Sequence, residues 1–132
     1  MSALKNYAGL TEDFLAEDFT PDAFTHEDHV GVAYELLTSM PFLDAAMLYA
    51  KSIRALAARL GAADKFNVTI TLAFMSIIAE RMQGRSFDSY DAFIAQNPDL
   101  LEKNLLDAWY PPETLASENS RNIFLMPTGT RS

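Results

Sequence analysis

The chain contains no cysteine, few glycines and no long hydrophobic run. Without cysteine there can be no disulfide, no thiolate metal ligand and no cysteine nucleophile. No apolar stretch approaches the ~18–20 residues that a membrane-spanning helix needs, and the N-terminus lacks the basic and apolar segments of a signal peptide. At 132 residues, the chain is long enough to bury a core without such covalent or metal support. We therefore expect one domain over residues 1–132, located in the cytoplasm.

Basic residues are also scarce, because 10 Lys and Arg stand against 18 Asp and Glu, for a net charge of −8. Residues 1–30 hold seven acids and one base, whereas the other 102 residues carry a net charge of only −2. An acidic chain is repelled by phosphate backbones and by anionic membrane surfaces. The sequence predicts no nucleic-acid partner and no membrane partner. Residues 1–20 are expected to form an acidic, solvated N-terminal arm, and residues 128–132 a flexible tail.

Helical periodicity dominates the sequence, and no stretch shows convincing strand alternation. Apolar residues recur at steps of three and four over 42–60, and residues 66–83 are apolar nearly all round, as is typical of a central helix. The other expected helices span roughly 11–18, 25–39, 87–96, 99–109 and part of 112–122. The apolar residues 123–127 are expected to dock as an extended segment. The predicted fold is all-α, a single-domain bundle of about five helices with the 66–83 helix at its centre.

His26 and His29 are the only histidines in the chain. Residues three apart lie on the same face of a helix, and Val30 and Ala33 share that face. Thr25 is a good N-cap residue for this helix, so both imidazoles are expected to point inward from its first turn. Three roles stay open for the pair: metal ligation, a metal-free polar pocket for a small ligand, and structural hydrogen bonding within the core.

A metal site would need further ligands from a second helix. Glu80 is the one acid in the apolar 66–83 helix, so a divalent metal would be held by His26, His29 and Glu80. Alternatively, Glu80 emerges at the exposed end of that helix. A carboxylate beside a histidine would raise the histidine pKa and create an acid/base pair suited to proton transfer. Whether the protein is an enzyme stays open.

The chain has one basic cluster, which could hold a small anion but is more typical of a solvated helix face. Its members are Lys51, Arg54, Arg59 and Lys65. The sequence has no P-loop, no dinucleotide-binding glycine signature and no nucleophile elbow around any serine.

Two segments resemble a family of small, functionally uncharacterised bacterial helical proteins, which carry Phe-x-His-x-x-His-Val/Leu-x-x-Ala followed by Lys-Tyr-His-x-Thr-x-Thr-x-Ala. Here these segments read Phe24-Thr25-His26-Glu27-Asp28-His29-Val30-Gly31-Val32-Ala33 and Lys65-Phe66-Asn67-Val68-Thr69-Ile70-Thr71-Leu72-Ala73, and a later Asn97-Pro98-Asp99-Leu100-Leu101 is similar as well. The resemblance covers roughly residues 24–110 and implies a three-histidine cluster that resembles a metal or acid/base site. Asn67 stands where the third histidine would be, and asparagine is a poor ligand for zinc or iron. The resemblance also places Thr69 and Thr71 beside the same cavity.

The leading hypothesis is a polar pocket for a small molecule, with a divalent metal as the less favoured occupant. The predicted ligand-binding residues are His26, His29, Asn67, Thr69, Thr71 and Glu80, and the predicted metal ligands are His26 and His29. The alternative is a non-enzymatic helical interaction protein that forms a homodimer and whose histidines are structural. A pocket predicts an internal cavity, whereas an interaction role predicts a large exposed apolar patch.

Overall fold

The computed structural model describes residues 7–16 and 25–127 of the chain. They form α1 (Tyr7–Ala16), α2 (His26–Ser39), α3 (Phe42–Arg59), α4 (Val68–Met82), α5 (Tyr90–Gln96), α6 (Pro112–Leu115) and α7 (Glu118–Asn122). Three short 3-10 helices connect them: η1 (Ala63–Lys65), η2 (Pro98–Leu101) and η3 (Leu105–Ala108). The described residues contain no strand, and the prediction of an all-α bundle is confirmed.

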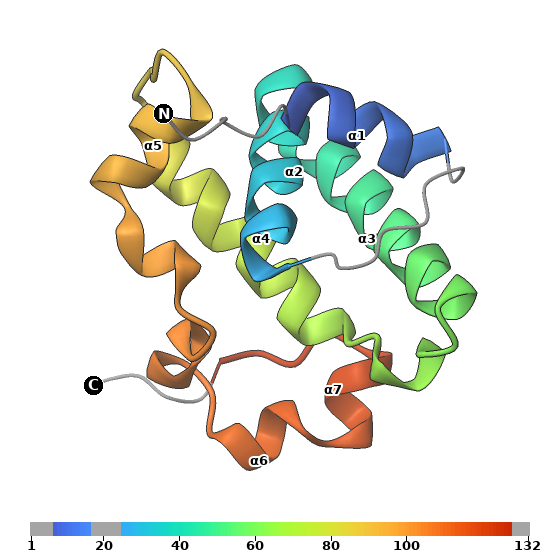
Figure 1. Ribbon diagram of the computed structural model, residues 1–132. Helices are drawn as coiled ribbons and strands as arrows, with labels where there is room; N and C mark the ends of the chain where they lie inside the picture. Colours follow the sequence, from blue (N-terminus) through green and yellow to red (C-terminus); the bar gives the residue numbers. More distant parts are fainter. Residues whose placement is uncertain (1–6, 17–24, 128–132) are drawn as a thin grey trace.

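Helix α4 runs through the middle of the molecule, with α2 and α3 on one side and the C-terminal residues on the other (Figure 1). Met75 and Ile78 join the main hydrophobic core, which α1, α2, α3 and α5 share. Ala73 joins a second apolar cluster with Leu106 and Tyr110. Because α4 packs against both clusters, few polar residues occur on it, and the predicted central position of this helix is confirmed.

The ends of the central helices follow the capping signals in the sequence. Thr25 and Asp28 form a capping box at the start of α2, as predicted. The Asn67 side chain accepts a hydrogen bond from the Ile70 backbone N–H and so caps α4. After α4, Gly84 adopts a left-handed backbone with φ +72°, a conformation that glycine reaches without strain.

Helix α1 packs against the face of α2 that carries Asp28 and Gly31. Tyr7 and Phe14 are buried in the main core, and the Tyr7 hydroxyl donates to the Asp28 carboxylate at 3.2 Å. A Cβ atom on Gly31 would lie 2.6 Å from the Tyr7 ring, so the close approach of the two helices requires glycine there. The prediction of a solvated arm is therefore wrong for Tyr7–Ala16. Its remaining residues lie outside the described chain, as does the predicted flexible tail at 128–132.

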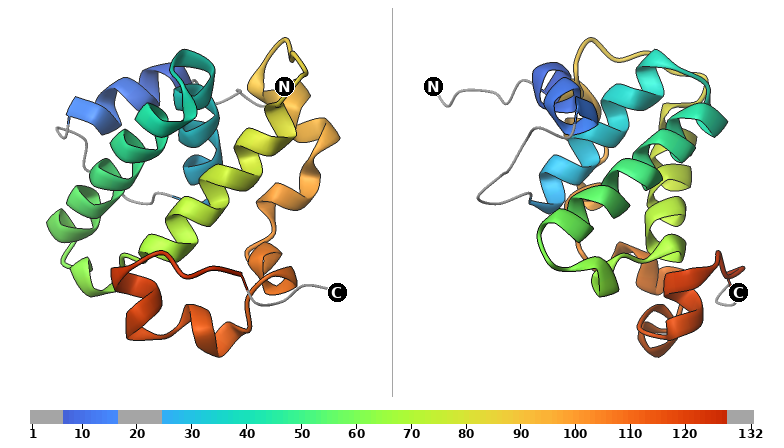
Figure 2. Two further views of the ribbon diagram at one scale, coloured as in Figure 1. Left: turned by 180° about the vertical axis from the view of Figure 1, so that it is seen from behind. Right: turned by 90° about the vertical axis from the view of Figure 1, so that its right-hand side faces the viewer.

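The predicted helix over 99–109 is also wrong, because η2 and η3 stand in its place. In an α-helix the Leu100 carbonyl would accept from the N–H of residue 104, but here it receives the His26 side chain. Helix α5 begins at Tyr90 instead of the predicted residue 87, because Ser89 caps it. The extended docking of 123–127 agrees with the prediction, and Figure 2 shows this segment beside α4 together with α6 and α7.

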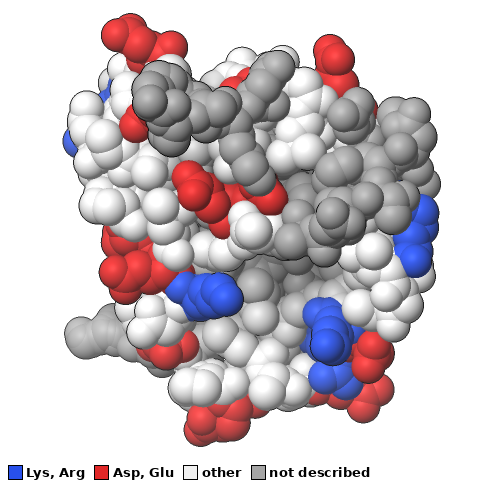
Figure 3. All heavy atoms as spheres, in the orientation of Figure 1, with Lys and Arg blue, Asp and Glu red and all other residues white. Residues whose placement is uncertain are grey.

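Acidic side chains are spread over the face of the molecule seen in Figure 3, with fewer basic side chains between them. Among the residues that the structure describes, no helix is both long and apolar enough to cross a bilayer.

Candidate functional site

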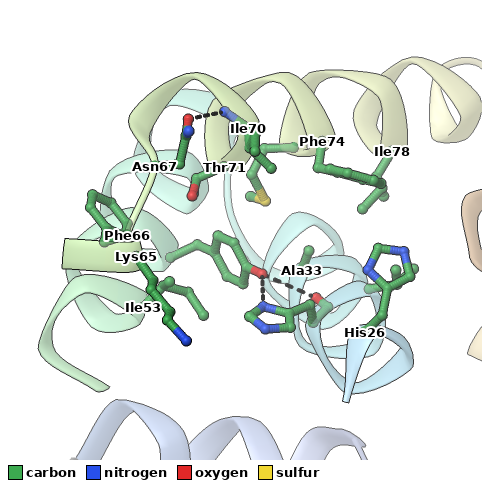
Figure 4. A pocket seen from close by; sticks show the side chains of 14 residues that line it. His26, Ala33, Ile53, Lys65, Phe66, Asn67, Ile70, Thr71, Phe74 and Ile78 are labelled. Carbon is green, nitrogen blue, oxygen red and sulfur yellow. Dashed lines mark hydrogen bonds between the residues drawn. The ribbon is translucent and has the colours of Figure 1, made fainter. Parts of the chain in front are cut away.

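A cavity of about 230 Å³ lies between α2, α3 and α4 (Figure 4). His26 and His29 both line it, so the prediction that the two imidazoles share the inward face of one helix is confirmed. Eight of the fourteen lining residues are apolar: Val30, Ala33, Ile53, Phe66, Ile70, Phe74, Met75 and Ile78. The polar lining residues are His26, His29, Tyr49, Lys65, Asn67 and Thr71. An apolar wall with a few polar groups is the usual composition of a small-molecule site.

His29 and Tyr49 form a neutral hydrogen-bonded pair in the wall of the cavity. Nδ1 of His29 lies 2.9 Å from the Tyr49 hydroxyl, which also donates to the His29 backbone carbonyl at 3.4 Å. Burial lowers the pKa of His29 to about 4, with His26 adding to this effect and Asp28 opposing it. Burial also raises the pKa of Tyr49. At neutral pH the pair therefore offers dipoles and no net charge.

His26 links the cavity wall to the C-terminal residues. Its Nε2 atom lies 3.0 Å from the Leu100 carbonyl oxygen, and because a carbonyl only accepts, Nε2 carries the proton. The His26 ring also meets the edge of Phe74, with the ring centroids 5.2 Å apart. The Leu100 bond and the Phe74 contact fix the orientation of the imidazole.

The backbone around Leu100 is held in turn by Arg81 at the end of α4. Arg81 binds both oxygens of Asp99, at 2.8 and 2.9 Å, and also donates to the Asn97 side chain at 3.1 Å. The Arg81 hydrogen bond lowers the pKa of Asp99 and raises that of Arg81. The residues of the Asn97–Leu101 segment therefore position His26 and lie outside the cavity lining.

Asn67 lines the cavity, but its side chain is engaged elsewhere. Its Oδ1 atom accepts from the Ile70 backbone and from the Ser120 hydroxyl, each at 2.9 Å. Its Nδ2 atom donates to the Leu115 carbonyl at 2.8 Å. Asn67 thus caps α4 and holds α6 and α7 against it, and these bonds occupy its Oδ1 atom and one of the two hydrogens on Nδ2.

Thr69 and Glu80 do not line the cavity, so their predicted place in the pocket is wrong. Thr69 is fully buried on another face of α4, where its hydroxyl donates to the Ile123 carbonyl at 2.7 Å and accepts from the Leu125 N–H at 3.0 Å. Glu80 is exposed near the end of α4, which was the alternative left open for it. Helix periodicity alone did not show which polar residues would face the C-terminal segment.

Thr71 was also predicted to bind the ligand, and its hydroxyl is available inside the cavity. Figure 4 shows its hydroxyl pointing into the cavity. No other group in residues 7–16 or 25–127 hydrogen-bonds to this hydroxyl. Thr71 therefore presents a donor and an acceptor inside a largely apolar space.

The described residues contain no group of three or more His, Cys, Asp or Glu side chains that could hold a metal ion. Nε2 of His26 serves the Leu100 carbonyl, and Nδ1 of His29 serves Tyr49. Each of these bonds uses one of the two nitrogens of its ring, as is usual for metal-bound histidines, so the bonds themselves do not exclude a metal. The described residues offer the pair no third protein ligand of the usual kind.

Two lining residues were missed as site residues by the sequence reasoning. Tyr49 belonged to the apolar stripe predicted for α3, and nothing in the stripe indicated that its hydroxyl would meet His29. Lys65 belonged to the basic cluster that was expected to form a solvated face. Lys65 directly precedes the apolar run of α4, and this position was the one sequence signal that Lys65 lies at the edge of the protein interior.

The comparisons with known proteins found no protein-family model, no curated protein and no solved structure that matches this chain. The resemblance to small bacterial helical proteins stays a prediction.

Proposed function

We propose that the protein binds a small, largely apolar molecule with one hydrogen-bonding group in the cavity between α2, α3 and α4. The observation that carries the proposal is the cavity itself, a largely apolar space that holds the Thr71 hydroxyl, which has no hydrogen-bond partner among the described residues. Clefts between helices that are lined mainly by apolar side chains with a few polar groups are typical small-molecule sites. A space of this size between long helices is therefore best explained as a binding site.

The volume of the cavity limits the size of the ligand. An engineered apolar cavity of roughly 150 Å³ holds one benzene molecule, which has six non-hydrogen atoms. By the same ratio, the 230 Å³ found here holds about nine non-hydrogen atoms. The proposed ligand is thus the size of a substituted benzene or of a short acyl chain.

The lining determines the polarity of the ligand. Phe74, Met75 and Ile78 supply apolar contact surface, and the neutral His29–Tyr49 pair adds polar atoms without charge. Thr71 supplies the hydrogen bond that orients the bound molecule. The affinity of such a site for a ligand comes from the apolar surface that binding removes from water, and its specificity comes from a few polar groups.

Thermal unfolding with a panel of neutral fragments of six to nine non-hydrogen atoms tests this proposal. A fragment that occupies the cavity raises the melting temperature of the wild type, because it binds only the folded state. Ala33→Leu fills the cavity from α2 and should abolish the response, whereas Ala58→Leu, at an exposed position on α3, should leave it intact. If Ala33→Leu fails to fold, Ile70→Phe fills the same space from α4. A panel without any response, or one unaffected by these fillings, would overturn the proposal.

The second candidate function is the predicted homodimer, which one surface feature favours. Leu43 and Met47 lie one helical turn apart on α3 and are 71 % and 51 % exposed, and neighbouring Phe42 is 43 % exposed. Exposed apolar residues at such spacing are typical of helix-packing surfaces. Sedimentation equilibrium tests this candidate: the wild type should associate with increasing concentration, and a Leu43→Glu/Met47→Glu variant should remain monomeric.

A further inference from the structure

We propose that the ligand is a small organic monoanion, a carboxylate, whose acid group is held at the Lys65 end of the cavity. This inference rests on the proposed binding function and adds the chemical class of the ligand.

The first observation is the charge of the lining. The chain carries 18 Asp and Glu residues, yet among the residues that the structure describes no acid lines the cavity, while one base, Lys65, does. In a protein of net charge −8, a described lining with one cation and no carboxylate is a local reversal of charge. A cation is repelled there and an anion is attracted.

The second observation is that Lys65 has no ion-pair partner within the described parts of the chain. Its side chain is exposed, so the ammonium group can move to meet a ligand at the entrance. Arg81 at the other end of α4 is already paired with Asp99. Lys65 is thus a base beside the cavity whose charge no described acid neutralises.

The third observation is the arrangement of the lining along the cavity. In Figure 4, Lys65, Phe66 and Thr71 lie towards one end, and His26 and Ile78 lie at the other. A carboxylate at the Lys65 end can accept a hydrogen bond from the Thr71 hydroxyl, while its apolar part extends towards Phe74 and Ile78. The cationic residue of the described lining and the available Thr71 hydroxyl therefore lie towards the same end of the cavity, where the acid group of a small organic acid can meet both.

Three probes of one shape and size test the charge preference directly: benzoate, benzamide and benzamidine. Each has nine non-hydrogen atoms, and at pH 7 they carry charges of −1, 0 and +1. The ion pair with Lys65 is exposed, so benzoate should bind about two- to fivefold tighter than benzamide, and benzamidine should bind most weakly. Dissociation constants come from NMR shift titrations, and the preference for benzoate should decrease at high salt.

Two variants assign the preference to Lys65. Lys65→Met keeps the length of the side chain and removes its charge, so benzoate and benzamide should then bind equally. Lys51→Met is the matched control, since Lys51 is exposed on α3 and does not line the cavity, and it should keep the preference for benzoate. Thr71→Val should weaken both probes.

The outcomes separate this inference from the proposed function. Equal binding of benzoate and benzamide to the wild type, or a preference that survives Lys65→Met, would overturn the carboxylate assignment and leave the binding function in place. Failure of all three probes to bind would overturn both. Tighter binding of benzoate that disappears with Lys65→Met and persists with Lys51→Met supports the assignment.

Discussion

Two regions of the molecule are held together by different interactions. Helices α1 to α5 share a large hydrophobic core in which rings pack closely, as where Tyr34 stacks on Phe93 with centroids 4.9 Å apart. Residues 98–127 form short helices and extended backbone. Leu100 reaches the main core, with Leu101 and Leu105 packed against it, and the rest of the segment shares a small apolar cluster with α4. Four backbone carbonyls of this segment, at Leu100, Leu115, Ile123 and Leu125, also accept hydrogen bonds from side chains 15 or more positions away in the sequence.

The difference follows from how each kind of backbone satisfies its polar groups. A long helix pairs most of its own N–H and C=O groups, so its side chains are free to form a core. Irregular backbone needs partners from elsewhere when it packs against a protein interior. Here His26, Asn67, Thr69 and Tyr110 provide them. Three of these four were predicted to bind a ligand, and the structure shows that their hydrogen bonds hold the C-terminal segment.

The largest loss of stability is expected for a substitution in the shared hydrophobic core. Phe93 is fully buried between Tyr34 and Phe87. Phe93→Ala should lower the free energy of unfolding by about 3–5 kcal/mol, because it removes apolar contacts and leaves a cavity. Urea denaturation should show this loss with every spectroscopic probe, whereas Ile123→Ala, at an exposed position, should change stability by less than about 0.5 kcal/mol. A small loss for Phe93→Ala would mean that the core does not dominate stability.

The two histidines differ in the same way as the two regions, because His29 is held within the helical core and His26 bonds to the C-terminal segment. The folded protein disfavours protonation of His29, whose pKa is lowered from 6.5 to about 4. The unfolded chain therefore binds more protons between these values, and stability should fall as the pH falls from 6.5 to 4. The full shift corresponds to roughly 3 kcal/mol.

His29→Gln is the control for this pH dependence, since glutamine does not titrate in that range. Urea midpoints at pH 7 and pH 5 should differ more for the wild type than for His29→Gln. Carboxylates that titrate at acidic pH affect both proteins alike and cancel in the comparison. Identical pH dependence in the two proteins would contradict the burial of a neutral His29.

Thr69→Val tests the polar attachment of the second region. It leaves the Ile123 carbonyl and the Leu125 N–H without their partner, at a cost of about 1–3 kcal/mol. The loss should be local: the Leu125 amide should exchange with solvent much faster, while the Phe93 amide keeps most of its protection. Thr71→Val, whose hydroxyl has no partner among the described residues, should leave both rates close to wild type. Uniform loss of protection after Thr69→Val would show that the two regions unfold together.

The smallest change in stability is expected at the contact between α1 and α2. Whether a substitution there stabilises or destabilises the protein should depend on Tyr7. Gly31→Ala places a Cβ atom against the Tyr7 ring and should destabilise the protein by about 1–2 kcal/mol. In a Tyr7→Ala background the clash is absent, and alanine should stabilise α2 by up to about 1 kcal/mol through its helix propensity. A double-mutant cycle by urea denaturation measures this reversal, and additive effects would exclude the close approach.

The sequence predicted the long helices well for a physical reason. The boundaries of α2, α3 and α4 follow from apolar periodicity and from capping residues such as Thr25 and Gly84, which act locally. The region after α5 was predicted less well, since its conformation depends on contacts with residues more than 45 positions away, such as Asn67 with Leu115. Periodicity contains no information about such contacts.

The site was predicted in part for the same reason. His26 and His29 were placed correctly because their spacing fixes a helix face. Asn67 and Thr69 were assigned to the site through the family resemblance, and Glu80 as the one acid in the 66–83 helix, yet a polar residue on an apolar helix can meet either a bound molecule or another part of the chain. The sequence does not distinguish them. Tyr49 and Lys65 could be recognised as lining residues only once α3 and α4 were placed side by side.

The most direct test of the central claim is to locate a bound probe by intermolecular nuclear Overhauser effects. Benzamide is suitable, because it fits the volume of the cavity and carries no charge. If benzamide occupies the cavity, its ring protons contact the methyl groups of Ile70, Met75 and Ile78, and these contacts are lost in Ala33→Leu. Contacts confined to surface methyl groups such as those of Leu43 and Met47, or no contacts at all, would contradict the claim that this cavity is a binding site.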